Sequence, residues 1–114
     1  MNAETRTSRI SRATWKRTER NIAGIIGGER VPVSGRQRGD QPDVRHDWLS
    51  VEVKHRQSIP QWLTTALTQS RAAVRGDQLP VAIIHRHGAR HAEDIVCLRL
   101  ADFVQWFGPV NEQE

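Results

Sequence analysis

A glutamate and a lysine separated by one residue, Glu52-Val53-Lys54, are the first residues of this sequence that could do chemistry. Side chains alternate between the two faces of an extended strand, so Glu52 and Lys54 would lie on one face, about 6–7 Å apart at a rise of ~3.3 Å per residue. A carboxylate can hold a divalent cation, and an amine beside it can handle a proton. Taken alone, this short pattern more often marks a charged, solvated strand face.

An aspartate that follows a proline adds to the chemical interpretation. Asp43 lies nine residues before Glu52, and a tight hairpin between them would bring the two carboxylates together. Two carboxylates at one point repel unless a cation lies between them, and Mg²⁺ typically takes one or two protein carboxylates together with water. Asp43 can alternatively be a turn residue after Pro42, and Asp40 and Asp47 compete for the same role.

A third acidic residue falls within a predicted helix. Glu19 lies one turn after Trp15 and three residues before Ile22, so it belongs to the apolar stripe of that helix. A carboxylate on a buried face costs several kcal/mol unless it is paired or coordinated. Glu19 is therefore a candidate metal ligand. The alternatives are a glutamate at the edge of the stripe that reaches water, or a buried ion pair with Arg30 or Arg45.

Together these residues resemble the PD-(D/E)xK nuclease superfamily, whose members share the restriction-endonuclease-like fold. Within that superfamily the sequence is most similar to the small archaeal-type Holliday-junction resolvases and related phage-encoded nucleases. The resemblance covers about residues 12–76 and consists of the order and spacing of four features, namely Glu19, the Ser34-Gly35 loop, Pro42-Asp43 and Glu52-Val53-Lys54.

The resemblance implies a divalent-metal site and the hydrolysis of DNA phosphodiester bonds. By analogy with the family, Glu19, Asp43 and Glu52 would bind Mg²⁺, with Mn²⁺ as a substitute, and the backbone carbonyl of Val53 would be a further ligand. Such a cation lowers the pKa of its bound water and polarises phosphate oxygens. The resemblance also implies a homodimer, since a resolvase makes two symmetric cuts.

The same resemblance assigns roles to three other residues. Lys54 would orient or help deprotonate the attacking water, Ser34 matches the family's loop serine, and Gln69 matches a glutamine that some branches carry on the next helix. The chain has fifteen arginines and two lysines. Because an amine can shift its pKa whereas a guanidinium stays protonated, a lysine at this position indicates a chemical requirement.

The basic charge is concentrated near the N-terminus. Residues 1–20 carry six Lys/Arg and two Glu, whereas the remainder carries eleven residues of each sign. This segment is either a solvated arm or a phosphate-binding one, since arginine suits bidentate contact with phosphate. The residues predicted to contact DNA are Arg9, Arg12 and Lys16, the loop arginines Arg36 and Arg38, and Gln69.

Three histidines, His85, His87 and His91, form an H-x-H-x-x-x-H pattern that invites a zinc interpretation. No cysteine accompanies them, and Gly88 interrupts the spacing, so a polar hairpin loop near DNA phosphate is favoured instead.

The elements that must position these residues alternate between helix and strand. The apolar spacing and the Gly, Pro and Asn/Asp signals predict the order α-β-β-β-α-β-β-α, a single α/β domain with a mixed central sheet flanked by helices in a restriction-endonuclease-like core. We expect a basic arm over 1–10, one domain over 11–110 and a tail over 111–114. The predicted elements are helices over 11–27, 58–76 (with Ser58 as cap and Pro60 in the first turn) and around 103–107, and strands over 29–33, 43–45, 49–55, a buried 80–85, and 95–100.

The predicted function is that of a metal-dependent DNA endonuclease, most similar to a resolvase of branched DNA in recombination or repair. Two alternatives stay open, a nicking or restriction-type nuclease of the same fold and a non-catalytic nucleic-acid-binding module. The longest apolar runs are far short of the ~20 residues that span a membrane, and Cys97 stands alone. We therefore expect a cytoplasmic protein without a disulfide framework or a membrane partner.

Overall fold

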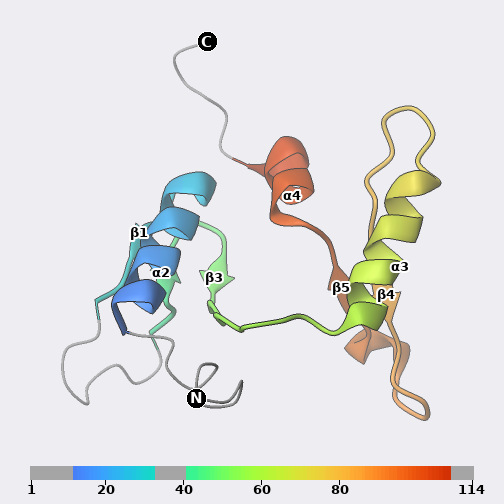
Figure 1. Ribbon diagram of the computed structural model, residues 1–114, viewed down its shortest axis with the longest axis horizontal. Coiled ribbons are helices and arrows are strands. Elements are labelled where there is room, and N and C mark those ends of the chain that lie inside the picture. Colours follow the sequence, from blue (N-terminus) through green and yellow to red (C-terminus); the bar gives the residue numbers. More distant parts are fainter. Residues whose placement is uncertain (1–11, 33–40, 109–114) are drawn as a thin grey trace, which may run out of the picture. The chain divides into compact units, whose positions relative to one another are not determined.

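The computed structural model describes residues 12–32 and 41–108, and the chain divides into two compact units, Met1–Gln57 and Ser58–Glu114. Each unit combines helix with a small antiparallel sheet (Figure 1). The predicted order of helices and strands is confirmed, with one additional 3₁₀ turn. The elements are α2 (Arg12–Ile26), β1 (Glu29–Arg30), β2 (Val44–Arg45), β3 (Ser50–Val51), α3 (Gln61–Ala72), β4 (Ala82–Ile84), η1 (His91–Glu93), β5 (Ile95–Cys97) and α4 (Leu100–Phe107).

Helix α2 buries one side against the first sheet. Glu19, Ala23 and Ile26 are buried, and their i, i+4, i+7 spacing is that of a single helix face. The helix ends at Gly27, whose φ of 78° is a left-handed conformation that glycine adopts without steric cost. The N–H of Gly28 then donates to the carbonyl of Ala23 at 2.8 Å, which satisfies one of the last carbonyls of the helix.

The first sheet has the order β1-β2-β3 and is antiparallel throughout. Val44 of β2 pairs with Val51 of β3, and Val44 is fully buried beneath α2, which contacts both β1 and β2. The strands are shorter than predicted. Pro42 offers no N–H to the ladder, so regular pairing cannot continue through it.

The turn between β2 and β3 is anchored on α2. The N–H of Trp48 donates to Nδ1 of His46 at 3.3 Å, so the ring proton lies on Nε2, which donates to the carbonyl of Ile26 at 2.9 Å. This bond satisfies the last carbonyl of the helix from a distant part of the chain. The tight hairpin predicted between Asp43 and Glu52 is confirmed by the antiparallel pairing of β2 with β3.

The second unit begins with α3, whose start differs from the prediction. Pro60 is the N-cap, with an extended ψ of 132° and no side-chain cap bond, so Ser58 as cap and Pro60 in the first turn are both wrong. The carbonyl of Pro60 accepts the N–H groups of Leu63 and Thr64, which places the first helical residue after the proline. None of the described residues of α3 is fully buried.

The second sheet is a two-stranded hairpin of β4 and β5 with α3 against β4. The prediction of a buried strand over 80–85 is wrong. Ala82 is buried, but Ile83 and its cross-strand partner Val96 are 63% and 58% exposed. A hairpin covered on one face leaves the other face open, and alternate residues lie on that open face. Helix α4 is confirmed where the aromatic residues predicted it.

The fold is a small mixed α/β arrangement with two separate antiparallel sheets. Within the described ranges no parallel strand pair links β3 to β4 across α3, so the single mixed sheet is not observed. Each strand pairs instead in antiparallel fashion with a neighbour along the chain.

None of the helices in the described part of the chain is long and apolar enough to cross a membrane.

Candidate functional site

A pocket of about 330 Å³ in the first unit is lined by residues from three segments of the chain. One segment is α2, the second precedes β2, and the third follows β3. The structure thus brings together residues that are up to 41 positions apart in the sequence. The described residues that line it are Trp15, Glu19, Gln41, Asp43, Glu52, Val53, Lys54, His55 and Arg56.

Glu19 lies on the buried face of α2, as its place in the apolar stripe predicted, and is 8% exposed. Its Oε1 accepts a hydrogen bond from Nε of Arg30 at 2.8 Å, and the Arg30 side chain is itself only 15% exposed. The alternative of a buried pair with Arg30 is therefore the observed arrangement. The guanidinium compensates a charge that would otherwise be costly to bury.

Asp43 is the most buried acidic residue that the structure describes, at 3% exposure. Its Oδ2 accepts the backbone N–H of Val53 at 2.5 Å, and its own N–H donates to the carbonyl of Val51 at 2.8 Å. The carboxylate thus binds the backbone of the segment that follows β3. Pro42, the residue before Asp43, has no N–H and cannot donate a hydrogen bond to the ladder. Asp47 is exposed in the hairpin turn and does not line this pocket.

Glu52 and Lys54 both line the pocket and are both exposed. Val51, Val53 and His55 alternate with these two residues along the chain and are half-buried, so the predicted alternation of faces is confirmed although the regular strand ends at Val51. Val44 and Val51 form the last pair of the hairpin. Asp43 comes just before Val44 and Glu52 just after Val51, so the two acidic residues lie next to this pair. An exposed carboxylate and an exposed amine are both accessible to a ligand from solution.

His55 is a pocket residue to which the sequence assigned no chemical role. The hydroxyl of Thr18 donates to the carbonyl of Thr14 at 3.1 Å, so its oxygen is the acceptor for Nδ1–H of His55, 2.8 Å away. In the neutral imidazole this tautomer leaves Nε2 as a proton acceptor. In the sequence, the alternation of side chains along residues 49–56 was the one signal for His55, since it placed this residue on the half-buried face. It could not reveal the hydrogen bond to Thr18, which lies 37 residues earlier in the chain.

The three acidic side chains share a pocket without converging as a ligand set. Among the described residues, the group whose His, Cys, Asp or Glu ligand atoms all lie within 4.8 Å of one another is His85, His91 and Asp94. Glu19 and Asp43 instead bind protein donors. The pocket can accordingly offer one freely accessible carboxylate, Glu52, with two buried carboxylates behind it.

The remaining predicted residues are placed less informatively. Lys16 is exposed on α2, and Gln69 is exposed on α3 in the second unit. Five others lie outside the described residues, namely Arg9, Ser34, Arg36, Arg38 and Asp40. Arg12 is the first residue of α2, and its side chain is outside the description.

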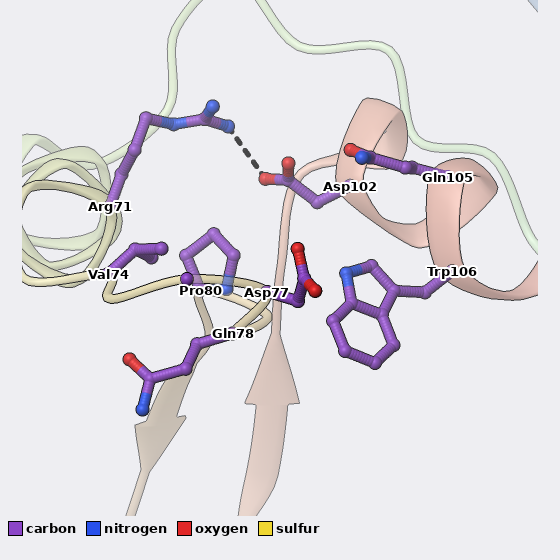
Figure 2. Close-up of a pocket in the computed structure, with 9 residues that line it drawn as sticks. Arg71, Val74, Asp77, Gln78, Pro80, Asp102, Gln105 and Trp106 are labelled. Carbon is purple, nitrogen blue, oxygen red and sulfur yellow. Dashed lines mark hydrogen bonds and ion pairs between the residues drawn. The ribbon is translucent and has the colours of Figure 1, made fainter.

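A second pocket, of about 490 Å³, lies wholly in the second unit. Figure 2 shows Arg71 of α3 reaching Asp102 at the start of α4, with Asp77 beside Trp106. Nη2 of Arg71 donates to Oδ2 of Asp102 at 2.6 Å, and the Asp102 side chain is 11% exposed. Its buried carboxylate is thus neutralised by an arginine, so this larger pocket has the chemistry of a structural ion pair.

The sequence matches no known family model, and neither the curated proteins nor the solved structures contain a significant match.

Proposed function

We propose that the pocket in the first unit is a metal-dependent site for hydrolysis of DNA phosphodiester bonds. One observation supports this most: Glu19, Asp43 and the Glu52-Val53-Lys54 segment come from three separate parts of the chain and line one pocket. The order helix, strand, hairpin around them resembles that of the PD-(D/E)xK nucleases, and the proposal includes a restriction-endonuclease-like core.

The donor set suits Mg²⁺, with Mn²⁺ as a substitute. Mg²⁺ prefers oxygen ligands, keeps several waters and needs only one or two protein carboxylates. Glu52 would be the direct carboxylate ligand because it is exposed, with Asp43 and the carbonyl of Val53 beside it. Glu19, held by Arg30, would act through bound water. The cation, when bound, activates water and shields phosphate charge.

Two side chains in the pocket could handle the proton of the attacking water. Lys54 supplies an exposed amine, as the family pattern implies. His55 supplies Nε2, because its Nδ1–H donates to Thr18. A group with a free lone pair near neutral pH is an effective general base. Within this proposal Lys54 stabilises the charge that develops on phosphate, while His55 is a second candidate base.

The substrate we propose is branched DNA, cut by a homodimer in the cytoplasm of a cell or phage-infected host. This finer assignment rests on the family resemblance and on the basic N-terminal residues. Arginine-rich segments bind phosphate with little regard to sequence, so they supply affinity rather than specificity.

The proposal is tested by cleavage of plasmid, duplex, flap and synthetic four-way junction in Mg²⁺ or Mn²⁺. We expect cleavage that EDTA abolishes, and a loss of at least 100-fold in Glu52→Gln and Lys54→Ala with DNA binding retained. Glu29→Gln is a matched control, since Glu29 is an exposed glutamate of the same unit outside the pocket. Cleavage that survives both pocket substitutions would refute the assignment.

A non-catalytic nucleic-acid-binding module is the second candidate. It is favoured by the protein partners of Glu19 and Asp43, which give both carboxylates a structural role in the fold. This candidate predicts salt-dependent DNA binding by the wild-type chain, with no cleavage of any substrate in the panel under either cation.

A further inference from the structure

Two histidines and one aspartate meet where the β4–β5 hairpin opens into its loop. We propose that His85, His91 and Asp94 form a binding site for a transition-metal dication of the Zn²⁺ type. The site lies in the second unit and shares no residue with the proposed hydrolytic pocket, so it goes beyond the proposed function.

The register of the hairpin brings the first two ligands together. Ile84 of β4 pairs with Ile95 of β5, and one step further along each chain lie His85 and Asp94. Residues directly opposite in an antiparallel pair have neighbouring side chains. The observed contact follows from this, with Nδ1 of His85 at 2.6 Å from Oδ1 of Asp94.

A short 3₁₀ turn adds the third ligand. Residues i and i+3 eclipse in such a turn, and η1 sets His91 three residues before Asp94, whose N–H donates to the carbonyl of His91 at 3.0 Å. Nδ1 of His91 lies 3.1 Å from Oδ2 of Asp94. Gly88, at a φ of 82°, adopts the left-handed conformation within the loop, so it accommodates the turn instead of interrupting a site.

The geometry of the cluster is close to that of three metal ligands. The ligand atoms all lie within 4.8 Å of one another, and the two rings stack with centroids 4.5 Å apart. Ligands at ~2.0–2.1 Å from a tetrahedral Zn²⁺ are about 3.3 Å apart. The two histidine-to-aspartate distances of 2.6 and 3.1 Å would need to lengthen by about 0.7 and 0.2 Å to reach this spacing.

The donor types select the class of metal. Two imidazoles and a carboxylate suit Zn²⁺, Ni²⁺ and Cu²⁺, whereas Mg²⁺ prefers oxygen ligands alone. Histidine binds a metal through its neutral ring, so two imidazoles and one carboxylate form a ligand set with one negative charge, which favours a dication. Arg86 and Arg90 in the same loop are exposed, so solvent and salt screen their repulsion. A three-residue site leaves a fourth coordination position for water or another ligand.

The test is a zinc titration of the untagged 114-residue chain, freed of metal with EDTA and followed by calorimetry. We expect one saturable Zn²⁺ site, and we expect its affinity to fall at least tenfold in His91→Ala. Loss of a residue that only supports a ligand already lowers metal affinity by about 10- to 100-fold, so loss of a ligand should do at least as much. His91 is suited to this substitution because its side chain is 85% exposed, so the fold should survive, which circular dichroism checks. His87→Ala is the matched control, an exposed histidine of the same loop outside the cluster.

Nuclear magnetic resonance of the five histidine rings locates the site directly. Zn²⁺ should shift the signals of His85 and His91 and leave those of His46, His55 and His87 in place. Equal weakening by His87→Ala, absence of saturable binding, or a shift confined to His55 would each overturn the proposal. Glu52→Gln should leave the zinc isotherm unchanged, so failure of this site and failure of the hydrolytic site are distinguishable.

Discussion

Replacing Asp43 separates a structural role from a catalytic one. Asp43 is 3% exposed, and its carboxylate accepts the N–H of Val53 at 2.5 Å. In Asp43→Ala that backbone donor keeps its half-buried position and loses this acceptor. Such a variant would lose activity whether or not the carboxylate ever binds a metal, so activity alone cannot assign its role.

The cost of the substitution follows from the orphaned donor. A buried polar group left without its hydrogen bond costs about 1–3 kcal/mol. Asp43→Asn retains a side-chain carbonyl that can accept the same N–H, so we expect it to lose only the charge assistance, roughly 1 kcal/mol. Glu52→Gln, at an exposed position, should change stability by less than about 0.5 kcal/mol.

Hydrogen exchange at the Val53 amide measures this loss where it occurs. A loss of ~2 kcal/mol in local opening corresponds to about 30-fold faster exchange, at 1.4 kcal/mol per factor of ten. We expect that acceleration in Asp43→Ala, a smaller one in Asp43→Asn and none in Glu52→Gln. Unchanged Val53 exchange in Asp43→Ala would refute the structural role. Full cleavage by Asp43→Asn would remove Asp43 from the metal site.

Three other substitutions test the packing of the two units. Gly28→Ala would place a Cβ 2.5 Å from the backbone oxygen of Arg45, so it should lower the free energy of unfolding by about 1–3 kcal/mol, measured by chemical denaturation. Gly24 in α2 has open space around it, so Gly24→Ala should raise the free energy of unfolding by roughly 0.5–1 kcal/mol. Equal effects of the two substitutions would contradict the close approach at Gly28. Arg71→Ala leaves the buried carboxylate of Asp102 without its partner at 2.6 Å. Because Arg71 is half-exposed, we expect the free energy of unfolding to fall by about 1–2 kcal/mol. An unchanged unfolding midpoint would contradict this expectation.

Local signals in the sequence predicted the elements well. The 3.6-residue spacing and the glycine that follows located α2, and the φ of 78° at Gly27 explains why that glycine ends it. The hairpin of β2 and β3 was predicted from its turn, and the alternation from Leu49 to Arg56 gave the correct faces. Each of these features depends on residues only a few positions apart.

Pairings between distant residues were the part that the sequence could not specify. The stripe position of Glu19 predicted burial, but only the folded chain selects Arg30 as its partner. The pattern of three histidines omitted Asp94, because the contact depends on the hairpin register and on η1. The bond between Thr18 and His55 has no sequence signature for the same reason.

The ion pair of Glu19 is the feature on which the choice between enzyme and binding module depends. The Arg30 guanidinium supplies the positive charge that the buried carboxylate of Glu19 requires. A dication near Glu52 would supply a larger positive charge to the same group of acidic residues, and the pair of Glu19 with Arg30 would then matter less for stability. A purely structural Glu19 needs Arg30 whether or not Mg²⁺ is present. Stabilisation of Arg30→Met by Mg²⁺, exceeding that of the wild type, would therefore indicate that a dication binds close to Glu19.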